Sequence, residues 1–444
     1  MSPTLSNLLS HLAAIAQQRL SPFFLEKPEN AEKTKKLPKL EIPTDDTPLA
    51  QFLQQHKLTA DEYAILAIGM VSHVQPHFFD NLMREYMPGG GDFPQIGGTR
   101  GANFRGFLPT GETALFLLAG EDPKRRFEVQ QVFAPDHFFS RKKILWLEDV
   151  TPGEPAMSGR VVLAPEYVDL FITGKVVPPR FSTLFPAERV ETNLEWSDLV
   201  LNPQTLEQVQ ELLVWLKHGQ TLLDHYGLGK RIKPGFRALF WGPPGTGKTL
   251  TAGLLGKHSG RDVYKIDLSM VVSKFIGETE KNLANLFDRA ENKDWILFFD
   301  EADALFGKRT SVRDAHDKYA NQEVSYLLQR VETYGGLVIL ASNFKSNIDE
   351  AFIRRFQSII HFPMPRPAER LRLWQQSFPE KLMPNGQTNL SALAQKYELS
   401  GAAILNIVQF ACLRALERGQ ERILDADLKE GVIREFGKEG KIVG

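Results

Sequence analysis

One segment, from Ala238 to Leu255, constrains more than any other what this chain can fold into. The apolar run Ala238 to Trp241 leads into the octapeptide GPPGTGKT, Gly242 to Thr249, and apolar residues at helical spacing follow it. Glycines let backbone N–H groups close around phosphate oxygens, and the N-terminus of the following helix adds a partial positive charge. Strand, glycine-rich loop and helix in this order predict an α/β fold with a phosphate-binding loop (P-loop).

The last residues of this loop have the side chains that a nucleoside triphosphate needs. Lys248 is expected to reach the β and γ phosphates, and the Thr249 hydroxyl to ligate Mg²⁺. We therefore expect a nucleoside triphosphate with Mg²⁺, although by itself the loop would equally suit a kinase, a GTPase or a transporter motor. The residues expected to line the nucleotide here are Gly242, Pro243, Pro244, Gly245, Thr246, Gly247, Lys248, Thr249 and Leu250.

A second apolar run, Ile296 to Phe299, ends in two carboxylates, Asp300 and Glu301. Open α/β sheets bind ligands at the carboxyl ends of their strands, so this pair is expected at the same edge as the loop. Asp300 suits the magnesium shell, and Glu301 can orient the attacking water or accept its proton. Together with the loop, the pair predicts hydrolysis rather than passive nucleotide binding.

Two further segments carry polar groups suited to the same chemistry. A third apolar run ends at Asn343, whose amide could bond the γ-phosphate or the attacking water; alone, it would be interpreted as a strand cap. Arg354 and Arg355 have no acidic residue at helical pairing distance on their C-terminal side. Guanidinium groups neutralise charge on a transferring phosphoryl group, so both arginines are catalytic candidates.

The pattern from about Glu191 onwards repeats strand, loop and helix, which predicts a parallel sheet covered by helices over residues 191–365. The expected strands are 238–241, 263–268, 295–299, 337–341 and 359–362. After the proline-rich stretch 363–367 the pattern is helical to the end, which predicts a small helical lid over 366–444.

The N-terminal part predicts a separate α+β domain of winged-helix type over residues 49–180, preceded by a helix and linker over 1–48. A capping box, Thr59 to Glu62, opens one helix, a second covers Phe78 to Tyr86, and β-prone runs at 144–147 and 159–163 flank a turn. Residues 88–112 hold eight glycines, which favours a loop over any regular element.

Composition limits the partners of this chain. The formal net charge is -1 and the pI near 6.8, so no global field draws the protein to nucleic acid or to an anionic bilayer. Neither a secretory signal nor an apolar run long enough to span a membrane is recognisable. We expect a cytoplasmic protein without a membrane or nucleic acid partner.

The order of glycine-rich loop, Asp-Glu strand end, Ser-Asn strand end and the segment IDEAFIRRF resembles that of the AAA+ ATPases, from about Glu191 to the C-terminus. The resemblance implies ATP as the nucleotide, with Mg²⁺, and a homo-oligomeric ring, a hexamer. It also implies that Asn343 is a sensor residue and that Arg355, helped by Arg354, is a finger presented to the neighbouring subunit's nucleotide. Many relatives carry a second arginine three positions after the finger, where this chain has Ser358.

The resemblance extends to two stretches beside the nucleotide. Trp196 to Leu199 is similar to the segment that contacts adenine, which implies contacts from Asp198 and Leu199; a plain helix-entry turn is the alternative. Ser400 to Ile404 stands where some AAA+ proteins have a second sensor arginine. This chain is similar there to the branch whose lid meets the nucleotide with small residues.

Phe275, Ile276 and Gly277 resemble the aromatic, apolar, glycine pore loop with which AAA+ hexamers grip polypeptide. Packing of Phe275 and Ile276 beneath the following helix is the alternative, but Lys274 and Glu278 on either side favour exposure. The pore loop implies a protein client.

Residues 266–343 and 107–113 resemble the AAA+ ATPases of bacterial contractile injection systems, which are phage-tail-like particles. That resemblance implies a particle component or cargo as client. Two other hypotheses remain open: an ATP-gated assembly scaffold that does not thread a chain, and a DNA-acting motor.

Overall fold

The computed structural model describes residues 2–24, 38, 45–87, 93–175, 179, 181–182, 185–268, 278–291, 293–302, 315–343, 353–384, 388–438 and 440. The chain divides into two compact units, Met1–Pro178 and Pro179–Gly444. None of the helices within these ranges is both long and apolar enough to cross a bilayer.

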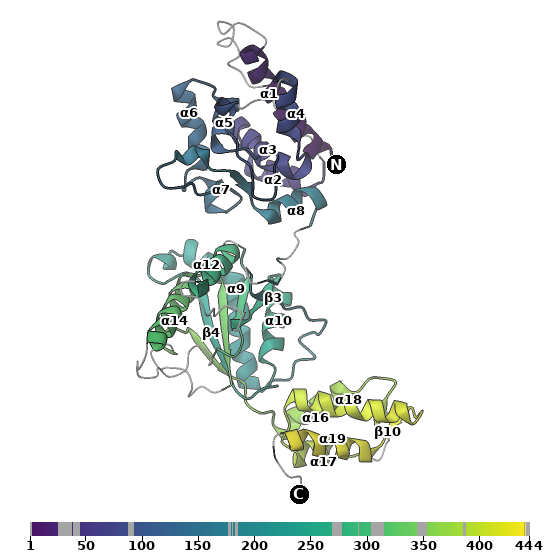
Figure 1. The fold of residues 1–444 in the computed structure, drawn as a ribbon. Coiled ribbons are helices and arrows are strands. Elements are labelled where there is room, and N and C mark those ends of the chain that lie inside the picture. Colours follow the sequence, from purple (N-terminus) through teal and green to yellow (C-terminus); the bar gives the residue numbers. More distant parts are fainter. Residues whose placement is uncertain are drawn as a thin grey trace. The chain divides into compact units, whose positions relative to one another are not determined.

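The first unit is mainly helical (Figure 1). It also contains a small hairpin, in which β1 (Leu145–Leu147) pairs antiparallel with β2 (Val161–Leu163). The helices are α1 (Pro3–Phe24), α2 (Pro48–His56), α3 (Ala60–Val74), α4 (Phe78–Tyr86), α5 (Gly111–Leu118), α6 (Pro123–Gln130), α7 (Phe138–Arg141) and α8 (Pro165–Thr173). The two predicted helices, α3 and α4, and both predicted strands are present.

The predicted capping box at α3 is confirmed. Thr59 N–H donates to Glu62 Oε2 at 2.7 Å, and Glu62 N–H donates to Thr59 Oγ1 at 3.3 Å, so two helix-terminal donors are satisfied reciprocally. The expectation that the glycine-rich segment is a loop without any regular element is wrong in part. A short 3₁₀ helix covers Pro94–Ile96, and α5 begins at Gly111 because Thr110 and Thr113 cap its first turn.

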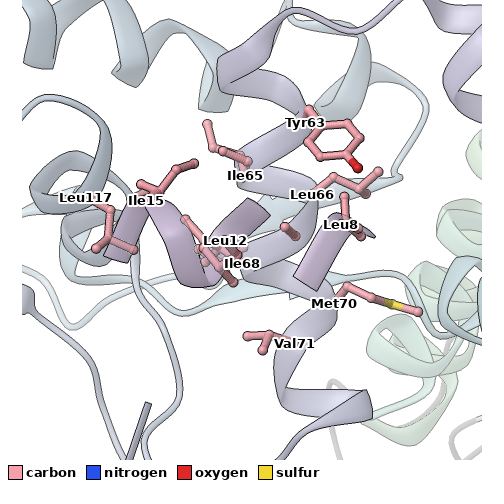
Figure 2. Close-up of a cluster of buried hydrophobic side chains, with 14 of the residues drawn as sticks. Leu8, Leu12, Ile15, Tyr63, Ile65, Leu66, Ile68, Met70, Val71 and Leu117 are labelled. Carbon is pink, nitrogen blue, oxygen red and sulfur yellow. The ribbon is translucent and has the colours of Figure 1, made fainter. Parts of the chain in front are cut away.

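Helix α1 belongs to the core of the first unit. Figure 2 shows Leu8, Leu12 and Ile15 of α1 beside side chains of α3, and all three are at most 2% exposed. Residues 63–71 of α3 are buried without a break, because α1, α5 and the hairpin surround that helix. The predicted division after residue 48 therefore differs from the packing of the chain.

The second unit contains a six-stranded sheet in the order β3-β5-β6-β7-β4-β8. Its five parallel strands are those predicted: β4 (Phe236–Trp241), β5 (Val263–Ile266), β6 (Ile296–Phe299), β7 (Leu337–Ser342) and β8 (Ser358–His361). Strand β3 (Ala187–Arg189) pairs antiparallel with β5 and was not predicted, because a three-residue edge strand with two charged side chains has no apolar pattern.

Helices cover both faces of this sheet. Leu239 of β4 faces a core with α12 (Glu278–Ala290) and α14 (Ala315–Thr333), while its neighbour Phe240 faces a core with α9 (Pro203–Asp224) and α10 (Lys248–Ser259). This alternation follows from the two-residue period of a strand. The predicted α/β fold with covering helices is confirmed.

The C-terminal helices form the predicted lid, with a core of its own around Trp374, Ile404 and Ile407. They are α16 (Pro367–Ser377), α17 (Leu390–Lys396), α18 (Gly401–Glu417) and α19 (Asp425–Lys438). A two-residue parallel pair, β9 (Met383–Pro384) and β10 (Arg422–Ile423), joins their loops.

Candidate functional site

The loop between β4 and α10 depends on its glycines. Gly242, Gly245 and Gly247 have φ values of 148°, 73° and 99°, which residues with a Cβ rarely adopt. A Cβ on Gly242 would also lie 2.0 Å from the carbonyl oxygen of Phe362. Glycines at these positions therefore allow the backbone to turn from β4 into α10.

Lys248 joins this loop to strand β7. Its ammonium donates to the carbonyl oxygens of Gly242 and Pro243 at 2.6 and 3.0 Å and to Asn343 Oδ1 at 3.4 Å. The lysine is only 7% exposed. Two residues predicted from motifs 95 positions apart thus lie in contact, which places Asn343 at the phosphate-binding loop.

The end of β6 holds Glu301 in a strained conformation. Its φ is 50°, in the left-handed region, and its N–H donates to Asp300 Oδ1 at 3.1 Å. The next residue, Ala302, donates its N–H to the carbonyl oxygen of Ala341 on β7 at 2.8 Å. Residues in such conformations cluster at functional sites, and here the backbone turn leaves the Glu301 side chain exposed.

The sheet order explains how the motifs meet. Strand β7 lies between β4 and β6, and Phe236 of β4 and Ile296 of β6 both stand opposite Leu337. The glycine-rich loop, Asn343 and the carboxylates therefore follow three neighbouring strands at one edge of the sheet. The order of these strands is not readable from the motifs themselves.

A lysine that the motifs did not indicate contacts the acidic pair. Lys265 of β5 lies with its Nζ 2.8 Å from Asp300 Oδ2, and the two side chains are 42% and 23% exposed. The only signal in the sequence is a single charged residue within the short apolar run from Val263 to Ile266.

Arg355 is held by an acidic residue from a distant part of the chain. Its Nη1 lies 2.9 Å from Glu332 Oε1 near the end of α14, and its side chain remains 44% exposed. Glu332 also pairs with Lys233. The hydrogen bond from Lys233 and the charges of Arg355 and Arg237 hold the pKa of Glu332 below its ordinary value, against the opposing effect of burial. Arg354 is exposed.

The two residues predicted to contact adenine, Asp198 and Leu199, have different surroundings. Leu199 is 7% exposed and lies against the loop, since a Cβ on Gly247 would be 3.5 Å from its Cδ1. Asp198 instead closes a turn, because its Oδ2 accepts the N–H of Glu195 at 2.7 Å. The carboxylate of Asp198 thus has the role that the helix-entry alternative describes.

The lid contacts the loop through small residues. Ala402 N–H donates to the carbonyl oxygen of Gly245 at 3.3 Å, and a Cβ on Gly245 would lie 2.7 Å from Ser400 Oγ. Gln376 of α16 donates to the carbonyl oxygen of Ser197 at 3.0 Å. These contacts place α16 and α18 beside the loop and the turn before α9.

Three predicted site residues, Phe275, Ile276 and Gly277, lie outside the described residues. Thr249 and Asp300 offer the oxygen donors that Mg²⁺ prefers, and phosphate oxygens and water usually complete its shell. Within the described ranges there is no cluster of three or more His, Cys, Asp or Glu side chains that could hold a metal ion by itself.

Residues 238–364 match the ATPase family associated with various cellular activities (AAA). This range begins in β4, ends just after β8, and includes the loop, both carboxylates, Asn343 and both arginines. The chain contains an AAA ATPase domain.

Relatives of known name extend this likeness. The chain is 32% identical over 266 residues to the ATP-dependent zinc metalloprotease FtsH 3 of Sphaerobacter thermophilus, covering 57% of this chain and 52% of that protein. It is 29% identical to the cell division cycle protein 48 homolog of Archaeoglobus fulgidus (56% and 33% covered) and 31% identical to the vacuolar protein sorting-associated protein 4B of Pongo abelii (51% and 51%). The chain spans about half of these relatives or less, so the likeness is that of the ATPase domain.

Proposed function

We propose that this chain hydrolyses ATP with Mg²⁺ in a homo-oligomeric ring and uses the energy to remodel a protein client in the cytoplasm. One observation carries the proposal: buried Lys248 contacts both the glycine-rich loop and Asn343, one strand away from the Asp300 and Glu301 pair. A positioned cation, a polar amide and carboxylates at one sheet edge are the parts that phosphoryl transfer to water requires.

The residues divide the work as follows. Lys248 exchanges carbonyl oxygens for phosphate oxygens when nucleotide binds, and Asn343 orients the γ-phosphate or the water beside it. Thr249 and Asp300 would hold Mg²⁺, which when bound neutralises phosphate charge. Glu301 orients the attacking water and accepts its proton. The AAA ATPase domain thus supplies one half of the chemistry from its own strands.

We propose that the other half comes from a neighbouring subunit. Arg355 is partly exposed while paired with Glu332, so its guanidinium lies at the surface, where a neighbour's nucleotide could compete for it. Arg354 beside it is exposed as well. A finger of this kind favours a closed ring, and we propose a hexamer.

The client is the least constrained part of the proposal. The pore-loop resemblance at Phe275 favours threading of a polypeptide, and the resemblance to the ATPases of contractile injection systems favours a particle component or its cargo. An ATP-gated scaffold would use the same site without threading, and a DNA motor would show salt-sensitive DNA binding and DNA-stimulated hydrolysis.

Three variants test this proposal. We expect purified protein to hydrolyse ATP only with Mg²⁺, and Lys248→Ala to lose nucleotide binding in calorimetry. Phe275→Ala should keep the ATPase rate and lose activity on a client captured with Glu301→Gln. Undiminished client activity of Phe275→Ala would favour the scaffold, and wild-type protein without ATPase activity would contradict the proposed function.

A further inference from the structure

Lys265 has an unusual place in the sheet. It belongs to β5, where Val263, Tyr264 and Ile266 are at most 2% exposed, and it stands in register with Phe298 of β6. Its side chain, 42% exposed, extends along the strand end to Asp300. A cationic residue in this otherwise apolar strand therefore reaches the carboxylate that the ATPase domain is expected to use for Mg²⁺.

The two oxygens of Asp300 have different partners. Oδ1 accepts the N–H of Glu301 at 3.1 Å, and Oδ2 lies 2.8 Å from Lys265 Nζ. The first contact supports the strained backbone of Glu301, and the second places a unit positive charge beside the carboxylate. The ammonium thus lies beside the same negative charge that would attract a metal ion.

We propose that Lys265 is a positioning residue that holds Asp300 in the nucleotide-free protein and competes with Mg²⁺ for its carboxylate. The inference rests on the proposed function, since it assumes that Mg²⁺ and nucleotide bind at this edge of the sheet. Two cations near one carboxylate repel each other, so the affinity for Mg²⁺ is lower with the lysine present.

The size of the effect follows from the exposure of the pair. Partly exposed ion pairs are weak, so removing the ammonium should lower the half-saturating Mg²⁺ concentration by up to about fivefold. The direction of the change in the half-saturating Mg²⁺ concentration is what tests the inference. A lysine that only supported the strand would leave the Mg²⁺ requirement unchanged when replaced by an uncharged side chain of similar length.

The experiment titrates Mg²⁺ into full-length protein with ADP and follows binding by calorimetry, so that no turnover is involved. Lys265→Met removes the charge and keeps the length, and Lys265→Arg retains the charge. Lys429→Met is the matched control, because Lys429 makes a similar 2.8 Å pair with Asp425 on the surface of the lid. ADP affinity in EDTA is measured for each variant.

We expect Lys265→Met to need less Mg²⁺ than wild type, and Lys265→Arg and Lys429→Met to match wild type. Added to Asp300→Asn, Lys265→Met should have no further effect, since the shared carboxylate charge is gone. An unchanged or higher Mg²⁺ requirement in Lys265→Met would overturn the inference. Wild-type protein that binds no ADP would instead contradict the proposed function.

If Lys265→Met does not fold, Lys265→Gln takes its place with the same expected result. Thermal unfolding in EDTA reports folding independently of nucleotide. A Gln variant that folds and keeps the wild-type Mg²⁺ requirement would overturn the inference as well.

Discussion

Glu301 combines a side chain suited to proton transfer with a backbone conformation that few residues other than glycine adopt. Its φ of 50° is fixed by contacts of its two neighbours, the Asp300 carboxylate and the N–H of Ala302. Hydrogen bonds therefore hold the Glu301 backbone on both sides, which fixes the point from which its side chain extends.

Replacing Glu301 by Gln should leave ATP binding intact and lower hydrolysis at least about 100-fold, because the amide cannot accept a proton from water. Calorimetry gives the binding constant and single-turnover kinetics give the rate. Glu207→Gln, on the exposed side of α9, is the control for loss of a carboxylate. Wild-type turnover in Glu301→Gln would refute the assigned role.

Replacing Arg355 by Ala should lower hydrolysis about 1000-fold in the assembled protein, the magnitude of a lost arginine finger. Mixed oligomers test whether Arg355 acts on the neighbouring subunit. An Arg355→Ala subunit has an intact Glu301 and would receive Arg355 from a Glu301→Gln neighbour. Recovery of ATPase activity on mixing supports action between subunits. If the two inactive variants stay inactive when mixed, action between subunits is contradicted. Comparing the ATPase rates of Arg354→Ala and Arg355→Ala identifies which arginine is the main finger.

Some residues of the candidate site could be predicted from the sequence, and others could not. Lys248, Asp300 and Glu301 are recognisable because local order along the chain defines their chemistry. Lys265 and Glu332 were missed because their partners lie 35 and 23 positions away, and such pairs depend on strand order and helix placement.

At the scale of elements, pattern and caps predicted most of the structure where apolar runs were continuous. Strand β6 and most of β7 are such runs, and α3 has a complete capping box. The edge strand β3 and the glycine-rich segment were predicted poorly, since pairing with β5 and the turn capped by Thr110 depend on contacts that short polar stretches do not reveal.

Replacing Thr59 by Ala should destabilise the first unit by about 1 kcal/mol, the usual effect of losing an N-cap side chain. Urea unfolding followed by circular dichroism measures the change. Thr151→Ala, in an exposed turn of the same unit, should have little effect. Equal stability of both variants would show that the capping box contributes nothing measurable.

For the whole molecule, the two units differ in what the sequence could establish. The second unit has a family match over residues 238–364, whereas the description of the first unit comes from its packing alone. Helix α1 was separated from that unit in the prediction because a polar stretch follows it, yet its leucines complete the core in Figure 2. Membership of a shared core is a property of three-dimensional contacts rather than of composition.

The first unit should lose stability as the pH falls below about 6.5. Burial lowers the pKa of His11, His56 and His73 below their ordinary value of 6.5, with a smaller contribution from Lys142 at His56. The unfolded chain therefore binds protons that the folded unit resists, so stability is complete above this pH and declines toward the lower folded pKa values.

Hydrogen exchange of α1 and α3, corrected for intrinsic rates, measures this at about pH 7.5 and about pH 5.5. His11→Phe keeps a ring against Tyr63, whose centroid lies 5.5 Å from that of His11, and should reduce the acid sensitivity. The same pH dependence in His11→Phe would assign the effect to the other two histidines.

The carbonyl oxygens around Lys248 have a consequence for how fast and how selectively a ligand can enter. The ammonium lost most of its water when the chain folded, so a phosphate group does not have to strip that water away on arrival. Association is then an exchange of one set of oxygens for another around a cation that stays dry. Weakly basic anions that bind the ammonium less strongly than a peptide carbonyl does would be rejected at this step.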